Sequence, residues 1–456
     1  MSTGHRLRSA AGAALAALAT GPAFAQPVHE DFKLIASDGA AFDYFGASVA
    51  ISGTTAIVGA PRDDDNGSES GSAYLIDLSN PNNIIETKLV ASDGNASARF
   101  GGSVAVSGTV AIVGGYQDDD LGLRAGSAYL FDTSTGAQIA KLTASDGSES
   151  DRFGYSVAIS GTTAIVGAWN ESAYLFDFSD PDNIVETVLT ASDAKWRMHF
   201  GYSVAISGTT AIVGAWLDDD NGLGSGSAYL FDFSDPDNIV ETKLTASDGA
   251  SGDKFGYSVA ISGTTAIVGA WLDDDNGLGF GSAYLFDISD RENIVETKLT
   301  ASDGWFQYFG YSVAISGTTA IVGAYRDDGD GYRVGSAYVF DFSNAGCITE
   351  TKLTASDGGN DDEFGQAVAI SDTAAIVGAH QDSLGDFQRA GSAYVFDVTP
   401  ACAADLNSDG RLSFFDVSAF LTAFNDQDPA ADFNCDTRYD FFDVAAFIVA
   451  FGRGCP

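Results

Sequence analysis

Oxygen-bearing residues near the carboxyl end of the chain have the spacing of a cation-binding loop. Asp405, Asn407 and Asp409 stand at positions 1, 3 and 5 of a twelve-residue segment that Asp416 closes. Side chains at alternate positions of such a loop converge on one point, and Ca²⁺ takes roughly six to eight oxygen ligands. Gly410 at position 6 permits the sharp turn that the loop needs. The segment therefore predicts a calcium site.

A second loop of the same kind follows the first. It departs from the pattern at Thr437, which stands where the first loop has Gly410. The residues predicted to surround the two ions, two of them through their backbone carbonyls, are Asp405, Asn407, Asp409, Arg411, Ser413 and Asp416, then Asp432, Asn434, Asp436, Arg438, Asp440 and Asp443. Each loop precedes an apolar pattern typical of an amphipathic helix. The residues in these patterns are Val417, Phe420, Leu421 and Phe424, then Val444, Phe447, Ile448 and Phe451.

Two loops of the EF-hand type, each followed by one helix, resemble a type I dockerin over residues 402–456. Dockerins bind cohesin modules, so the resemblance implies attachment to a cohesin-like or cell-envelope anchoring protein. The positions that choose the partner in cellulosomal dockerins usually carry small polar residues. Here they are Phe414, Phe415, Phe441 and Phe442, which argues against a cellulosomal cohesin. The alternative is a module that only stabilises the chain end through calcium.

The chain has four cysteines. Cys402 and Cys455 bracket the carboxyl-terminal module, so we expect them to form a disulfide, as in a clamped module used for surface anchoring. Cys347 and Cys435 have no evident partner in the sequence. Disulfides require an oxidising compartment, so this expectation depends on export.

The amino terminus has the pattern of an export signal. Arg6 and Arg8 precede an apolar run from Ala10 to Ala19, which is too short to span a bilayer. Small residues at Ala23 and Ala25 suit a signal peptidase, so residues 1–25 are predicted to be removed. No later apolar run reaches membrane-spanning length. We expect a mature protein that is secreted, extracellular or associated with the cell surface.

The elements that must position any site in the rest of the chain come from one repeated stretch. Residues 200–215 occur in seven versions, and the Phe-Gly pairs that open them are 47 to 55 residues apart. The pairs begin at Phe45, Phe100, Phe153, Phe200, Phe255, Phe309 and Phe364. Short β-branched and aromatic runs between turn residues predict four strands in each unit, over 203–207, 210–214, 227–233 and 239–246 in the fourth. Four-stranded units without helices between them predict a seven-bladed β-propeller over residues 31–399.

The two ends of the repeat array predict how the ring closes. The seventh unit stops after its third strand, at Asp397. Residues 32–39 match residues 242–249, which form the fourth strand of a complete unit. We therefore expect the amino-terminal segment to complete the last blade.

The repeat resembles the FG-GAP repeat of integrin α subunits and many secreted bacterial proteins. The resemblance rests on Phe-Gly-x-Ser followed by Val-Gly-Ala, with a proline after it only in the first unit, at Pro61. It implies a binding or adhesion platform more often than an enzyme, and loops that often hold Ca²⁺.

Acidic loops between the second and third strands should gather on one face of the ring, beside the Ala-Ser-Asp-Gly linkers. The carboxylates proposed as calcium ligands there are Asp63, Asp65, Asp118, Asp120, Asp218, Asp220, Asp273 and Asp275. Polar turns stabilised by Asx hydrogen bonds are the alternative. The third unit lacks this loop and runs directly from Trp169 to Glu171 and Ser172.

Aromatic residues precede the acidic loops. Trp169, Trp216 and Trp271 occupy equivalent places in adjacent units and could form a platform for a protein or glycan ligand. Shielding of the interfaces between blades is the alternative. The histidines are isolated, and no catalytic constellation is evident, so we expect a non-catalytic binding platform. A secreted carbohydrate-active protein is the second hypothesis.

The charge balance limits the partners. The chain carries 63 acidic residues against 22 Lys and Arg, a formal charge of −41. Such a surface repels phosphate backbones, so nucleic-acid binding is not expected. It suits solubility in salt or binding of cations.

Overall fold

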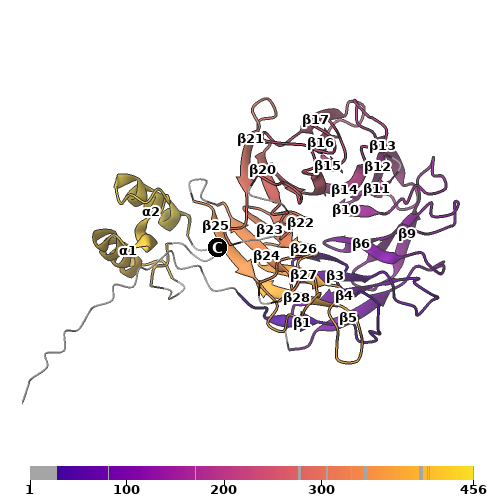
Figure 1. Ribbon diagram of the computed structural model, residues 1–456, viewed down its shortest axis with the longest axis horizontal. Helices are drawn as coiled ribbons and strands as arrows, with labels where there is room; N and C mark the ends of the chain where they lie inside the picture. Colours follow the sequence, from indigo (N-terminus) through magenta and orange to yellow (C-terminus); the bar gives the residue numbers. More distant parts are fainter. Residues whose placement is uncertain are drawn as a thin grey trace, which may run out of the picture.

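The computed structural model describes residues 28–454 except 81, 170, 276–278, 304–306, 330, 344–346, 400–403, 408 and 410. The predicted signal segment and both Cys402 and Cys455 lie outside the described residues. Seven four-stranded antiparallel sheets form a ring, with two helices beside it (Figure 1). The structure confirms the seven-bladed β-propeller.

Each blade is built from strands that are consecutive in the chain, except the last. Blades one to three contain β2 (Ser48–Ser52), β3 (Thr55–Ala60), β4 (Ser72–Asp77), β5 (Ile85–Leu89); β6 (Phe100–Ser107), β7 (Val110–Gly115), β8 (Ser127–Asp132), β9 (Gln138–Leu142); and β10 (Ser156–Ser160), β11 (Thr163–Ala168), β12 (Ser172–Asp177), β13 (Val185–Leu189). Blades four and five contain β14 (Phe200–Ser207), β15 (Thr210–Ala215), β16 (Ser227–Asp232), β17 (Val240–Leu244); and β18 (Phe255–Ser262), β19 (Thr265–Ala270), β20 (Ser282–Asp287), β21 (Val295–Leu299). Blades six and seven contain β22 (Ser312–Ser316), β23 (Thr319–Ala324), β24 (Ser336–Asp341), β25 (Thr349–Leu353); and β26 (Ala367–Ile370), β27 (Ala374–Ala379), β28 (Ser392–Asp397), with β1 (Phe32–Leu34) as the fourth strand.

The amino-terminal strand closes the ring as predicted. β1 pairs antiparallel with β28, with Phe32 opposite Val395 and Leu34 opposite Ala393. The last blade is therefore built from both ends of the repeat array, which holds the ring closed. Because the four strands of a blade alternate in direction, the linkers from one blade to the next lie on the same face as the loops between second and third strands. We call this the loop face.

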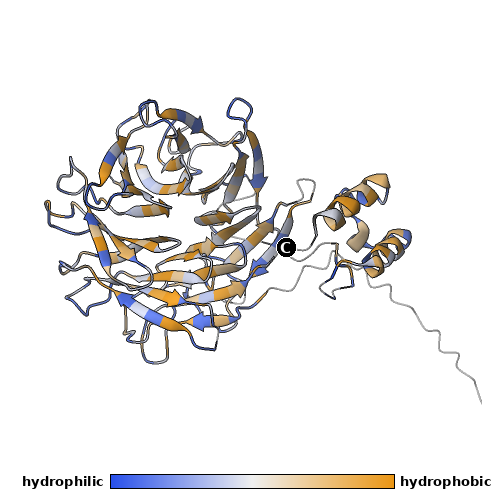
Figure 2. Cartoon of the chain, turned by 180° about the vertical axis from the view of Figure 1, so that it is seen from behind, coloured by the Kyte–Doolittle hydropathy of each residue, from blue (hydrophilic) through white to orange (hydrophobic). Residues whose placement is uncertain are grey.

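Burial explains the residue types of the strands. The second strand of each blade, Thr-Ala-Ile-Val-Gly-Ala in most of them, is buried on both sides because neighbouring blades cover it. The fourth strand lies at the outer edge of each blade: in β21 its residues alternate between exposed and partly covered, and only the final Leu299 is buried. Hydrophilic residues accordingly gather at the loops and the outer strands (Figure 2).

The Phe-Gly pairs join one blade to the next. Phe200 is fully buried and packs edge-on against Tyr229, with ring centroids 5.5 Å apart. Gly201 has φ +90°, and a Cβ there would lie 2.3 Å from the carbonyl oxygen of Ser172 in the preceding blade. Glycine is required at this position by both its backbone angle and the close approach.

The carboxyl-terminal module contains α1 (Phe414–Asp426), the short 3₁₀-helix η1 (Pro429–Ala431) and α2 (Phe441–Arg453). The two long helices pack through Phe420 and Phe447, whose rings stack 4.1 Å apart. The amphipathic prediction was wrong at Leu421 and Ile448, which are both exposed. The two-helix core is too small to cover every apolar position. None of the described helices is long and apolar enough to cross a membrane.

A disulfide joins the module to the ring. Cys347, in the connection between β24 and β25, is bonded to Cys435, in the second acidic loop of the module. The sequence offered no partner for either cysteine because 88 residues separate them. Only the folded chain brings them together, and the bond tethers the module to blade six.

Candidate functional site

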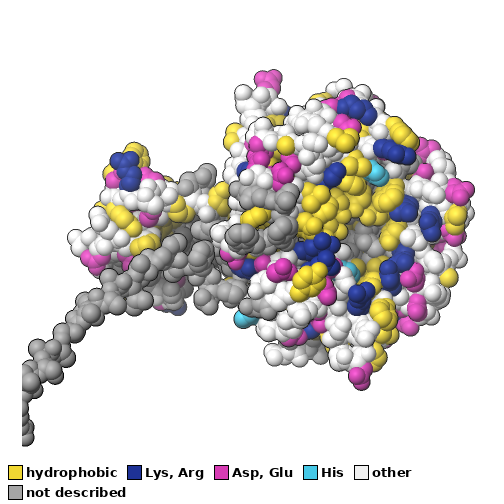
Figure 3. Space-filling view, viewed as in Figure 1, with side chains coloured by type: hydrophobic (Ala, Val, Ile, Leu, Met, Phe, Trp, Pro, Cys, Tyr) yellow, Lys and Arg dark blue, Asp and Glu magenta, His cyan; other side chains and the backbone are white. Residues whose placement is uncertain are grey.

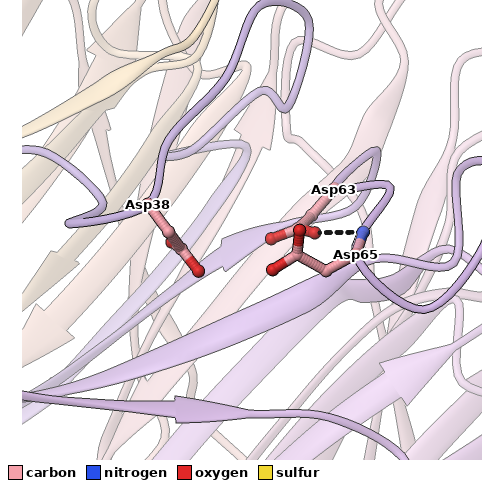
Figure 4. A group of neighbouring side chains, drawn as sticks. All are labelled: Asp38, Asp63 and Asp65. Carbon is pink, nitrogen blue, oxygen red and sulfur yellow. Dashed lines mark hydrogen bonds between the residues drawn. The ribbon is translucent and has the colours of Figure 1, made fainter.

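The loop face brings together the carboxylates that the sequence singled out. In blade one, Asp63 and Asp65 of the loop meet Asp38 of the preceding linker (Figure 4). Ligand oxygens in each group of this kind lie within 4.8 Å of one another. The groups of three are Asp38, Asp63 and Asp65; Asp93, Asp118 and Asp120; Asp193, Asp218 and Asp220; and Asp248, Asp273 and Asp275. By their carboxylates alone, these groups could hold a metal ion.

A lysine that the sequence analysis missed lies inside each group. Lys88 of β5 places its Nζ 2.7 Å from Asp38 Oδ2, 2.7 Å from Asp63 Oδ2 and 2.6 Å from Asp65 Oδ2. Lys141, Lys243 and Lys298 do the same in blades two, four and five. Lys352 and Lys33 each join two aspartates in blades six and seven. A metal ion would have to displace the ammonium group, so the residues present do not fit a metal without rearrangement.

Hydrogen bonds from tyrosine complete each group. In blade four, Tyr229 Oη donates to Asp193 Oδ1 at 2.8 Å and to Asp218 Oδ2 at 3.2 Å. Burial alone would raise the pKa of Asp218, but hydrogen bonds from Lys243 and Ser227 lower this pKa to about 2. Burial likewise opposes the charge of Lys243, yet its three aspartate partners raise its pKa. The group is therefore a mutually stabilised set of charges at neutral pH.

The third blade shows that lysine and acids belong together. Its fourth strand has Val188 at the lysine position, and its second strand leads into Trp169 without the acidic loop. The one linker aspartate that remains, Asp146, accepts a hydrogen bond from Tyr174 Oη at 2.9 Å. The blade that has lost the acids has thus also lost the cation.

Aromatic side chains form a second feature, at the centre of the loop face. They make a continuous chain across blades two to six, with successive ring centroids 4.4 to 6.4 Å apart. We call this chain the axial arc. Its members are Tyr116, Tyr155, Trp169, Tyr202, Trp216, Tyr257, Trp271, Tyr311 and Tyr325. Figure 3 shows hydrophobic side chains gathered in the hollowed centre of this face, with Lys and Arg around them.

Four blades place a tyrosine at the centre of the ring, and the other three do not. Hydroxyl groups of four tyrosines, Tyr155, Tyr202, Tyr257 and Tyr311, follow one another at 2.9 to 3.1 Å across blades three to six. The equivalent positions in blades one, two and seven are Ala47, Gly102 and Gln366. The centre of the ring is therefore filled by tyrosines on one side only.

The three tryptophans predicted as a ligand platform are partly covered by neighbouring side chains. Trp216 has the His199 ring stacked 5.2 Å away and Lys254 Nζ 5.2 Å from its centroid. The guanidinium of Arg152 lies 4.0 Å from the centroid of Trp169. The indoles are half-buried between blades and support cations, so the shielding alternative holds for much of their surface.

Two histidines, His199 and His380, contact the aromatic rings of this face. Burial first, then the charges of Arg389 and Arg62, lowers the pKa of His380 to about 3. Burial followed by Arg197 lowers the pKa of His199. Both imidazoles are neutral at physiological pH and lie against aromatic rings.

The two predicted calcium loops of the module form as loops in which side-chain oxygens accept hydrogen bonds from backbone N–H groups of the same loop. In the first, Asp409 N donates to Asp405 Oδ1 at 3.1 Å and to Asn407 Oδ1 at 3.0 Å. Asp416 and Asp443 at the last loop positions are fully buried and accept backbone hydrogen bonds. The second loop repeats these contacts, and Arg411 and Arg438 donate backbone N–H groups to the aspartate two residues earlier.

The acids of the module's two loops are arranged differently from the groups of three aspartates in the ring. Ser413 and Asp440 cap their helices and bond the carboxylates at the last loop positions. Thr437 adopts φ +61°, the left-handed conformation for which glycine was expected. Among the described residues, the groups of three acids within 4.8 Å all lie in the ring. Convergence of the module's ligands on an ion would therefore require their side chains to turn.

Comparison with known proteins identifies the class to which this geometry belongs. The family model described as FG-GAP repeat matches residues 29–76, 85–131, 137–176, 185–231, 240–286, 295–340 and 348–396. The chain belongs to the FG-GAP repeat family, whose propellers are typically non-enzymatic and often extracellular or surface-associated. The match ends before the carboxyl-terminal module.

Comparison with solved structures adds the fold alone. A chain of the solved structure titled "Crystal Structure of Mitotic Checkpoint Complex" superposes with a TM-score of 0.51 at 12% identity, over 86% of this chain and 99% of that one. No curated protein matches the sequence.

Proposed function

We propose that this protein is an exported, non-catalytic binding platform that is attached to a partner at the cell envelope through its carboxyl-terminal module. The observation that carries the proposal is the axial arc, a half-buried aromatic surface at the hollowed centre of the loop face. Large apolar surfaces on an otherwise polar face are typical of binding sites. The groups of carboxylates recur around the ring, each bonded to a lysine, which argues for a structural role of these acids over a single active site.

The proposal that the module attaches the protein to a partner rests on four exposed phenylalanines. Phe414, Phe415, Phe441 and Phe442 open the two helices of the module and are 77%, 70%, 75% and 65% exposed. A small module gains nothing for its own fold by exposing four aromatic side chains at equivalent positions, which supports a docking surface. This arrangement agrees with the dockerin-like pattern, with aromatic contacts in place of polar ones.

Calcium is proposed for the module rather than for the ring. The module's two loops offer carboxylate, amide and carbonyl oxygens and have no internal lysine. Bound Ca²⁺ would be held in the first loop by Asp405, Asn407, Asp409 and Asp416, and would fix the loops that present the phenylalanines. In the ring, an ammonium group already lies among the equivalent acids and offsets part of their charge.

Retention on cell envelopes tests the proposal. We expect purified full-length protein to sediment with envelopes of the producing cell in Ca²⁺ and to be released by chelator. Phe441→Ser with Phe442→Ser should reduce retention at least tenfold. Phe387→Ser, at a phenylalanine that is 52% exposed on a propeller loop, should leave it unchanged. Retention that survives both chelator and the double substitution would refute the attachment role.

A secreted carbohydrate-active protein is the second candidate, because the axial arc offers aromatic surface beside carboxylates. Hydrolysis of a polysaccharide by the purified protein, lost on substitution of one aspartate, would favour this candidate over the non-catalytic platform.

A further inference from the structure

The basic residues of the ring are divided between two uses. Six lysines of the fourth strands, together with Lys195, are bonded to aspartates of the acidic groups. Arg291 lies apart from the loop face, in the connection after β20, and bonds Thr210 Oγ1. The remaining nine all belong to linkers and loops of the loop face, and we call them the cationic rim. They are Arg62, Arg99, Arg124, Arg152, Arg197, Lys254, Arg326, Arg333 and Arg389.

Most of the cationic rim has no acidic partner, although acids outnumber bases nearly threefold in the chain. Glu69 lies 2.5 Å from Arg99 and 3.8 Å from Arg62, and Asp361 lies 3.9 Å from Arg333. Within the described residues, no carboxylate lies within 4 Å of the other six cations. These are Arg124, Arg152, Arg197, Lys254, Arg326 and Arg389. Free cations are concentrated on one face of an otherwise strongly acidic protein.

Aromatic rings hold the cationic rim in place. Arg152 lies over Trp169, Lys254 over Trp216, and the Arg326 guanidinium 4.7 Å from the Tyr308 centroid. In blade one, which has no tyrosine at the centre, Arg62 lies 4.5 Å from the centroid of the Tyr44 ring. A cation–π contact orients a guanidinium without neutralising it, so its donors stay available to an anion.

Polar atoms without partners concentrate at the same place. Eleven buried side-chain nitrogen or oxygen atoms of the described residues have no hydrogen-bond partner, and eight belong to this face. They are atoms of Arg99, Trp169, His199, Trp216, Trp271, Arg326, Gln366 and His380. Buried polar groups elsewhere in a fold are normally satisfied, so their accumulation marks a site that was not built for stability alone.

The backbone adds a cost at the same positions. The residue before each Phe-Gly pair has positive φ, between 52° and 65°, and none of the seven is glycine. They are Tyr44, Arg99, Arg152, His199, Lys254, Tyr308 and Glu363. Residues with a Cβ are strained in this conformation, whereas glycine is not. The same strained position is therefore occupied by a residue with a side chain in all seven blades.

We propose that the loop face binds an acidic polysaccharide, whose carboxylate or sulfate groups pair with the cationic rim while its sugar units cover the axial arc. This inference rests on the proposed role as a binding platform and names its ligand class. Eight of the nine rim cations are arginine, whose planar fork matches a carboxylate or sulfate through two hydrogen bonds. The lysines of the ring other than Lys254, by contrast, are bonded to the acidic groups.

A polysaccharide fits the arrangement better than an acidic peptide. The free cations are spread over several blades instead of surrounding one pocket, and so match a chain that carries a charge on successive units. A cleft of about 400 Å³ opens at the cationic rim, where Arg99 and Arg124 line it together with Glu69 and Asp119. Stiff, ring-shaped units also lose less conformational freedom on binding than a flexible peptide does.

Titration calorimetry on the full-length protein tests the inference. The probes are polygalacturonate and dextran sulfate, with neutral dextran and poly-L-glutamate for comparison. We expect at least one acidic polysaccharide to bind, with an affinity that falls as salt rises, and neutral dextran to give no heat. Arg152→Gln with Lys254→Gln should weaken binding at least tenfold. Arg291→Gln is the matched control and should leave the affinity unchanged.

Each other outcome contradicts the inference. Absence of binding to both acidic polysaccharides would overturn it, as would equal affinity of the double variant and wild type. Poly-L-glutamate bound as tightly as the polysaccharides would replace the saccharide with an acidic protein segment. Envelope retention through the module is measured separately, so its success with failed polysaccharide binding would leave the platform without this ligand.

Discussion

Removal of one internal lysine should destabilise the ring and create a metal site. The ammonium of Lys88 contacts three carboxylates, of which Asp63 is buried and Asp38 and Asp65 are more than one-third exposed. Leaving a buried charge without its partner costs about 3–5 kcal/mol. Solvent screens the two exposed partners, so we expect Lys88→Met to lower the free energy of unfolding by about 2–3 kcal/mol.

Calcium should then restore what the substitution removes. Without the ammonium, three carboxylates with ligand oxygens within 4.8 Å face one another, which suits a divalent cation. A ligand that binds only the folded state raises stability, by about 2.7 kcal/mol at one hundred times its dissociation constant. We therefore expect millimolar Ca²⁺ to stabilise the ring of Lys88→Met and to leave that of wild type unaffected.

Urea unfolding of full-length protein, followed by tryptophan fluorescence, measures both effects. The tryptophans lie in the ring, so the signal reports the propeller and not calcium binding by the module. Lys195→Met is the control, because Lys195 is 48% exposed and should cost less than about 1 kcal/mol. An equal response of wild type and Lys88→Met to Ca²⁺ would refute the reasoning, as would an unchanged midpoint for Lys88→Met without Ca²⁺.

Three further predictions concern the ring. Because the pKa of Asp218 is lowered from 3.8 to about 2, its contribution to stability is present above pH 3.8 and lost as pH falls toward 2; Asp218→Asn should flatten this part of an acid-unfolding curve. Gly201→Ala should cost at least about 3 kcal/mol in urea unfolding, whereas Gly208→Ala, which also has positive φ but meets no atom within 4 Å, should cost about 1 kcal/mol; equal costs would contradict the close approach between blades. Deletion of residues 26–36 should remove β1 and lower the thermal midpoint strongly, while an unchanged midpoint would show that β1 does not close the ring.

The fold could be predicted because its determinants are local and repeated. The Phe-Gly pairs, the short apolar strands and the turns recur at nearly constant spacing, so seven blades follow from periodicity alone. The displaced copy of a fourth strand at residues 32–39 predicts that the amino terminus closes the ring, and the pairing of β1 with β28 confirms it. The same repetition correctly placed the acidic loops beside the Ala-Ser-Asp-Gly linkers.

The internal lysines were missed although the repeats contain a signal for them. Lys88 is 25 residues from Asp63, and only the pairing of β4 with β5 brings the two together. The signal is the joint loss in the third unit, where Val188 replaces lysine and the acidic loop is absent. Comparing units position by position would have linked the acids to the lysine.

Amino-acid order by itself determined the number of blades, the closing strand and the face on which the acids gather, because each depends on patterns within a few dozen residues. The tertiary structure alone decided what neutralises those acids, which cysteines pair and which cations stay free. These outcomes depend on distances between groups far apart in the chain: ion pairs are strongest at contact and a disulfide needs adjoining thiols, and only the folded protein sets those distances.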